Sequence, residues 1–250
     1  MSLIVVLICL IAGLLIGAVG IGGVLLVPAL TYVVGIDVHQ AIPACMLSFL
    51  ATGIIGAIVF ARHGSIQWPV AAWLGLGAVP AAYLGSLVLP FTPTDLVMAF
   101  IALLMVLAGY DAWKKPRVTG VQSVGRERLS KIHYVLIGAV TGFGSAISGT
   151  GGPLILVPLL IYLGMPVLTA IGLSQAIQIP IAAFASVGNW INGSLDFQLA
   201  LTMSIVLVIA TLAGAILIHR LPRDPIRKWV ALFVLLVGAG IGIRLLLDVF

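Results

Sequence analysis

The chain has 250 residues, of which 62% are hydrophobic and only 8% are charged, and its mean hydropathy is +1.29. Soluble domains carry about 25% charged residues, so this composition is that of an integral membrane protein and excludes a water-soluble catalytic or nucleic-acid-binding domain. The net charge of +5 fits Lys and Arg gathered in cytoplasmic loops better than contact with nucleic acid. We therefore expect the lipid bilayer, and no nucleic acid, as a partner.

The apolar segments predict an all-α polytopic membrane protein. A spanning helix needs about 20 residues, and six segments fit one crossing each. Segments 3–34 and 133–163 are too long for one crossing and short for two, and glycines interrupt both. Without a basic region before it, the first segment is expected to stay in the membrane rather than be cleaved as a signal peptide. The eight segments are 3–34, 41–61, 68–89, 95–113, 133–163, 170–189, 197–219 and 226–248.

The chain contains an internal repeat within one membrane domain. Residues 1–113 form the first repeat, the polar loop 114–132 follows, and residues 133–250 form the second repeat. At a constant offset of 129, "VGIGGVLLVPA" (19–29) matches "SGTGGPLILVP" (148–158), and "HGSIQW" (63–68) matches "NGSLDF" (192–197). Because coincident glycines are rarer by chance than coincident apolar residues, this register indicates duplication.

Loop charge predicts that the repeats are inverted. If every segment crossed once, the basic loop 220–228 would lie opposite the basic loop 114–132. If segments 3–34 and 133–163 return to their side of entry, all basic loops share one side, as the positive-inside rule requires. We expect a multi-pass protein of the bacterial cytoplasmic membrane, with cytoplasmic basic loops and extracytoplasmic termini. Re-entrant hairpins and pairs of short crossings give the same parity, so both stay open.

The two glycine breaks predict an anion site. Inverted repeats with broken helices meeting near the midplane are a known transporter plan. A helix N-terminus offers free N–H groups and a partial positive charge, and glycine allows close approach of a ligand. The alternative is that the glycines only allow close helix packing, which suits Gly138 and Gly142 well. Pro28 and Pro158 follow the breaks and are expected to act as hinges or kinks.

Polar side chains on the next segments extend the candidate site. Cys45, Ser48 and Thr52 share one helix face, as do Ser174 and Gln178, with Gln175 beside them. Either cavity lining or interhelical hydrogen bonding explains them. The expected substrate-binding residues are Gly20, Gly22, Gly23, Cys45, Ser48, Ser148, Gly149, Thr150, Gly151, Gly152, Ser174, Gln175 and Gln178.

The acidic residues all lie near expected helix ends, which favours an anion over a cation as the transported substrate. No spacing of Cys or His predicts a metal site, and no cofactor is expected. Whether transport is coupled to a proton stays an open question, and no buried acidic residue supports such coupling. The sequence leaves the oligomeric state and the direction of flux undefined.

The duplicated chain, with "GAVGIGGVLLVPAL" and "GTGGPLILVPLLIYLGMP", resembles the TauE/SafE sulfite exporter family over essentially its whole length. The resemblance implies transport of sulfite or a related sulfur oxyanion or organosulfonate, without enzymatic activity. The first motif reads Gly-Ile-Gly-Gly-Val, whereas many relatives have a third consecutive glycine. The positions carried over from the family are Gly20, Gly22, Gly23, Pro28, Gly149, Gly151, Gly152 and Pro158.

We expect a secondary transporter that works by alternating access around a midplane site. Two alternative functions are an anion channel or facilitator and a non-transporting membrane scaffold. An intramembrane serine hydrolase is the third alternative, with Ser145 or Ser148 as nucleophile and His133 or His219 as base.

Overall fold

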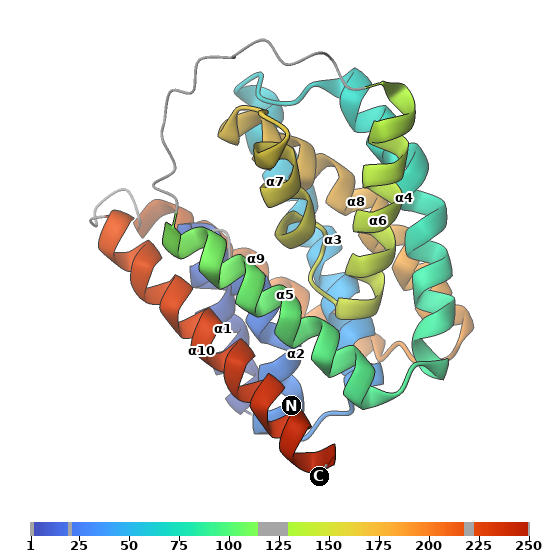
Figure 1. The fold of residues 1–250 in the computed structure, drawn as a ribbon, viewed down its shortest axis with the longest axis vertical. Coiled ribbons are helices and arrows are strands. Elements are labelled where there is room, and N and C mark those ends of the chain that lie inside the picture. The colour runs from blue at the N-terminus through green and yellow to red at the C-terminus, as the bar shows by residue number, and fades with distance from the viewer. Residues whose placement is uncertain (1–2, 20–21, 115–129, 218–222, 250) are drawn as a thin grey trace.

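The computed structural model describes residues 3–19, 22–114, 130–217 and 223–249, and every regular element in these ranges is a helix. The expected all-α fold is therefore confirmed (Figure 1). The α-helices are α1 (Leu3–Val19), α2 (Leu26–Ala29), α3 (Val38–Arg62), α4 (Trp68–Val88), α5 (Thr94–Lys114), α6 (Lys131–Ser148), α7 (Pro153–Tyr162), α8 (Val167–Ile191), α9 (Phe197–Leu217) and α10 (Arg223–Val249). Short helices of other types are η1 (Gly22–Leu25), η2 (Leu30–Val34) and η3 (Leu89–Phe91).

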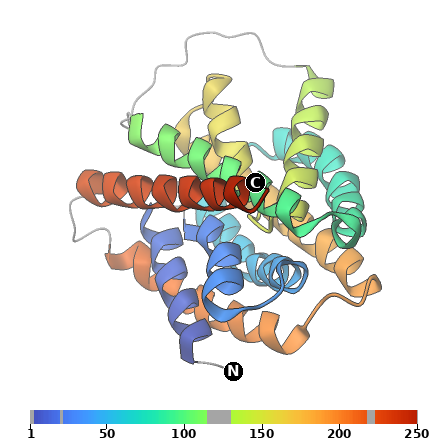
Figure 2. The ribbon, with the colours of Figure 1, turned by 60° about the horizontal axis from the view of Figure 1, so that its bottom comes forward.

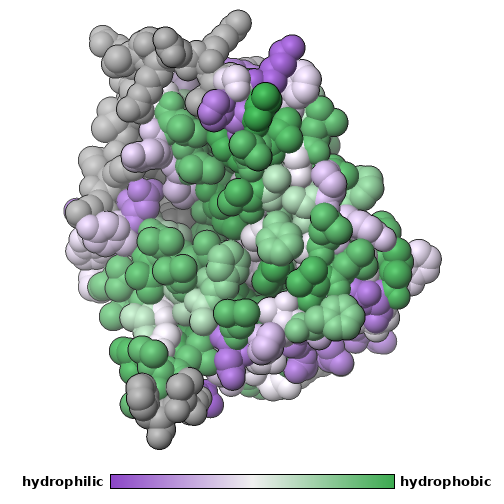
Figure 3. Space-filling view, turned by 45° about the vertical axis from the view of Figure 1, so that its right-hand side comes forward, coloured by the Kyte–Doolittle hydropathy of each residue, from purple (hydrophilic) through white to green (hydrophobic). Residues whose placement is uncertain are grey.

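Six of the described helices are long and apolar enough to cross a membrane: α3, α4 with η3, α5, α8, α9 and α10. They correspond to the six segments predicted to cross once. In each apolar stretch, half or more of the residues are not buried inside the protein, as lipid-facing helices require. Figure 3 shows hydrophobic side chains across the middle of one face and hydrophilic ones near its upper and lower ends. The chain is a multi-pass membrane protein.

Both glycine-rich segments are interrupted, as predicted. The first contains α1 and then a continuous helical stretch of three types, η1, α2 and η2; the second contains α6 and α7. In Figure 1, α6 leaves the upper end of the molecule and α7 returns to it, and the first segment starts and finishes at the lower end. At 1.5 Å per residue, the ten residues of α7 span about 15 Å, half of the hydrocarbon core. The helix α7 is therefore shorter than a single full crossing requires.

Helices from the two halves pack against each other throughout the molecule. α4 packs on α6 and α1 on α9, while α3 packs on α8 and α5 on α10 (Figures 1 and 2). Close approach at the α4–α6 contact depends on glycine, because a methyl group on Gly138 would lie 2.8 Å from the carbonyl carbon of Leu74. The packing role expected for Gly138 and Gly142 is confirmed. α3 and α8 are the most buried spans and form the centre of the molecule.

Candidate functional site

The second break, residues 149–152, is built from backbone that only glycine adopts readily. α6 ends at Ser148, and Gly149 closes it with φ of 64° while its N–H donates to Ser145 O over 2.9 Å. Gly151 and Gly152 have φ of 78° and 95°. A side chain at such φ values strains the backbone, so the three glycines are what turns the chain from α6 into α7.

The start of α7 leaves polar backbone groups available at this break. The N–H groups of Ile155 and Leu156 donate to Gly152 O over 3.2 and 3.0 Å, while Pro153 has no N–H. The N–H of Leu154, in the first turn, therefore has no acceptor within its own helix. This helix end presents donors and a partial positive charge, and its own first turn contains no cationic side chain.

Three hydroxyl groups surround the second break, and one of them is free. Ser148 Oγ donates to Gly144 O over 2.7 Å and lies 2.9 Å from Thr150 Oγ1. Ser145 is fully buried, and its Oγ has no hydrogen-bond partner among the described residues. This oxygen lies 3.8 Å from the position that a Cβ on Gly152 would occupy. The unpartnered hydroxyl therefore lies at the start of α7.

The two breaks meet across the ring of Phe49, a residue of α3 that the sequence did not single out. A Cβ on Gly23 would lie 3.1 Å from Phe49 Cζ, and a Cβ on Gly151 would lie 2.9 Å from Phe49 Cδ2. The ring is only 3% exposed and so separates the two glycine stretches. Gly22 instead packs on the backbone of α1, and Gly20 lies outside the described residues.

Gln178 joins the two central helices beside this ring. Its Nε2 donates to Phe49 O over 2.8 Å and to Thr52 Oγ1 over 3.2 Å. The interhelical hydrogen bond that the sequence left as one alternative is thus present for Gln178. Gln175 of α8 is half-buried, and its side chain lies against Gly56 of α3.

The remaining candidate side chains make contacts within α3 and α8 or between helices. Ser48 Oγ donates to Ala44 O over 2.7 Å and to Ala200 O over 3.0 Å, which holds α3 against α9. Ser174 Oγ donates to Ile171 O within α8, and Cys45 is a fully buried free thiol. Pro28 precedes the switch from α2 to the π-helical η2, and Pro158 lies inside α7.

The structure separates the components of a serine hydrolase. His133 lies at the start of α6, where its Nδ1 is 2.7 Å from Ser130 Oγ. Ser145 lies twelve residues further along the same helix, which is about 18 Å. Proton transfer needs hydrogen-bond distance, so His133 cannot activate either serine. His219 lies outside the described residues.

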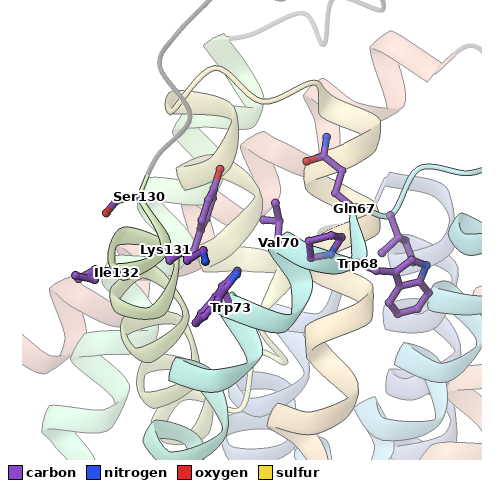
Figure 4. Close-up of a pocket in the computed structure, with 10 residues that line it drawn as sticks. Gln67, Trp68, Val70, Trp73, Ser130, Lys131 and Ile132 are labelled. Atoms are coloured by element: carbon purple, nitrogen blue, oxygen red, sulfur yellow. The ribbon is translucent and has the colours of Figure 1, made fainter.

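A separate groove of about 1060 Å³ lies at the starts of α4 and α6. Its walls include Trp68, Trp73 and Lys131, and Lys131 Nζ lies 5.0 Å from the centre of the Trp73 ring. Figure 4 shows Lys131 beside Trp73, with Gln67 and Trp68 across the groove. Aromatic and basic side chains at helix ends are typical of the membrane interface, so this groove is not the expected midplane site.

Comparison with known proteins gives a consistent result. Residues 5–241 match the family model described as "Sulfite exporter TauE/SafE". The chain is 23% identical to "Probable membrane transporter protein YdhB" of Bacillus subtilis over 94% of this chain and 98% of that protein. It is 24% identical to "Probable membrane transporter protein MJ0441" of Methanocaldococcus jannaschii over 82% and 81% of the two chains. No solved structure matches significantly.

Proposed function

The chain belongs to the sulfite exporter TauE/SafE family of membrane transporters, and from this premise we propose that it carries small anions across the bacterial inner membrane. The proposed substrates are sulfite or a related sulfur oxyanion or organosulfonate. The observation that supports this best is the unpartnered Ser145 hydroxyl buried at the N-terminus of α7.

The chemistry of that position suits an anion. A buried hydroxyl without a partner destabilises the protein by about 1–3 kcal/mol, and a ligand oxygen would relieve this. The N–H of Leu154 and the helix dipole add further attraction. In the proposed site these groups, with Ser148, Thr150, Gly151 and Gly152, bind the anion without a counter-charge. Binding is then weak enough for release on either side.

Alternating access follows from how the halves are combined. We propose that the halves are inverted repeats, because each of the most extensive helix pairings takes one member from either half. The Gln178 to Phe49 hydrogen bond joins residues that are 129 positions apart, which is the repeat offset. Two symmetry-related positions touch only near the axis that relates them, so the axis would pass between α3 and α8. The halves would rock about this contact, with Gly23 and Phe49 opposite Gly151.

The other candidate residues take supporting roles in this proposal. Ser48 and Gln178 hold α3 in position, and Cys45, Ser174 and Gln175 complete the packing around it. The end bearing Arg62 and Lys131 is proposed to face the cytoplasm, which leaves the termini outside.

Sulfite flux in proteoliposomes tests this proposal. We expect Ser145→Ala to raise the KM for sulfite about tenfold, which corresponds to about 1.4 kcal/mol. Thr141→Ala is the matched control, because Thr141 is in the same helix but its Oγ1 already donates to Ile137 O over 2.8 Å. An unchanged KM in Ser145→Ala would remove Ser145 from the site. Flux that saturates and is stimulated by anion on the opposite side supports a carrier over a channel.

A further inference from the structure

Two further polar side chains without a hydrogen-bond partner among the described residues lie near the C-terminal end of α8. Asn189 is fully buried, and Ser186, three residues earlier on the same helix face, is 7% exposed. Asn189 Nδ2 and Oδ1 and Ser186 Oγ have no hydrogen-bond partner among the described residues. One buried amide and one buried hydroxyl are thus both without a partner among the described residues, although the large majority of buried side-chain polar atoms in proteins are paired.

The neighbouring polar groups at this end of α8 already have hydrogen-bond partners. Ser86 Oγ, which lies against Gly188, donates to Tyr83 O over 2.7 Å. Asn192 Nδ2 donates to Ser86 O over 3.0 Å, which ties the end of α8 to α4. Ser194 donates to the backbone oxygen of Asn189 through both its N–H and its hydroxyl. The backbone of Asn189 is therefore held while its side-chain amide stays available.

The pair lies in line with the second break. A Cβ on Gly152 would lie 3.4 Å from Ile181 Cδ1, so Ile181 marks the level of the break on α8. Asn189 is eight residues further, about 12 Å along the helix axis, toward loop 192–196. Ala182 and Ala185, small and fully buried, lie between these levels. The pair is therefore on the side of the break that faces away from Arg62 and Lys131.

We propose that Ser186 and Asn189 form a second ligand position, which holds a small, singly protonated oxyanion between the second break and loop 192–196. This inference rests on the proposed function. The amide offers two donor hydrogens and one acceptor oxygen, and the hydroxyl can donate as well. A singly protonated oxyanion has acceptor oxygens for the donors and one O–H for Asn189 Oδ1. A dianion leaves Oδ1 unpaired and brings a second charge into a position that has no cationic partner among the described residues.

Equilibrium binding and flux of radiolabelled sulfite on the full-length protein test the second position. We expect Asn189→Leu, which keeps the number and branching of the side-chain heavy atoms but removes both polar atoms, to reduce binding from two sites to one and to lower flux at least tenfold. Wild-type affinity for sulfite should rise as the pH falls, and this dependence should be weaker in the variant. Sulfate stays a dianion at the pH values at which sulfite binds its first proton, so sulfate should not occupy the second position.

Stability separates a ligand role from a structural one. Asn189→Leu removes an unpaired buried amide, so its thermal unfolding temperature without ligand should be equal to or above that of the wild type. Ser204→Ala is the control, because Ser204 Oγ already donates to Ala200 O over 2.7 Å and its loss should leave binding unchanged.

Three outcomes overturn the inference in distinguishable ways. If Asn189→Leu keeps two binding sites and wild-type flux, Ser186 and Asn189 hold water only, and the proposed function stands. If the wild-type protein neither binds nor moves sulfite, both proposals fail together. A lower unfolding temperature with unchanged binding would show that Asn189 is structural.

Discussion

Replacing Gly151 by alanine should block transport through a steric contact that a matched glycine lacks. Gly151 and Gly35 have nearly the same φ, 78° and 80°, so a methyl group strains the backbone equally at both, by about 1–2 kcal/mol. At Gly35 the methyl group would meet nothing within 4 Å. At Gly151 it would lie 2.9 Å from Phe49 Cδ2 and 3.1 Å from Cγ.

The size of the effect follows from how tightly the Phe49 ring is held. Carbon atoms prefer separations of about 3.5–4.0 Å, so the ring must move by roughly 0.5 Å or more. Gly23 lies against the far end of the ring, so this movement presses on the first break. Overpacking of this kind costs about 1–3 kcal/mol beyond the strain at φ. We expect Gly151→Ala to lose at least tenfold in sulfite flux, and Gly35→Ala to keep most of its flux.

The assay compares both variants in proteoliposomes at equal amounts of inserted protein, together with thermal unfolding in detergent. Adding Phe49→Ala to Gly151→Ala removes Cγ and Cδ2, the ring atoms that the methyl group would meet, and should restore part of the flux. If Gly151→Ala transports as fast as Gly35→Ala, the close contact between Gly151 and Phe49 is not needed for transport. The proposal that the two breaks form the transport site is then refuted.

Three other substitutions test the packing that holds the site. Gln178→Leu removes two bonds between α3 and α8 and should lower the free energy of unfolding by about 1 kcal/mol, at about 0.6 kcal/mol per bond; an unchanged unfolding curve would contradict this. Ser48→Ala loses the hydroxyl's hydrogen bonds to Ala44 O within α3 and to Ala200 O of α9 and should keep transport, so a loss of flux would make Ser48 a site residue. Gly138→Ala should reduce the yield of folded protein in detergent because its methyl group meets the Leu74 backbone, whereas Gly240→Ala, with nothing within 4 Å, should match the wild type.

The sequence predicted those features that depend on local pattern and loop charge. Continuous apolar stretches fixed the six spans, and glycine at 149, 151 and 152 indicated the second break because few other residues adopt positive φ. Pairings across helices could not be predicted this way. Ser48 was expected to share a role with Cys45, yet its hydroxyl contacts Ala200 of α9, a partner 152 residues away.

The sequence also could not predict which buried hydroxyl and amide groups lack a hydrogen-bond partner. Ser145 and Ser148 share one helix face, and only side-chain geometry determines that Ser148 is paired with Thr150 while Ser145 is not. Phe49 gave no signal because an aromatic residue in a membrane helix usually faces lipid or the core. Its importance comes from α7 folding back against it.

The position of a bound anion tests the central claim most directly. A structure determined with selenite, a heavier analogue of sulfite, would locate the ligand by its anomalous scattering. We predict a peak within hydrogen-bond distance of Ser145 Oγ and the N–H of Leu154, at the start of α7. A peak only in the groove beside Lys131 and Trp73, with nothing at the second break, would contradict the proposed site.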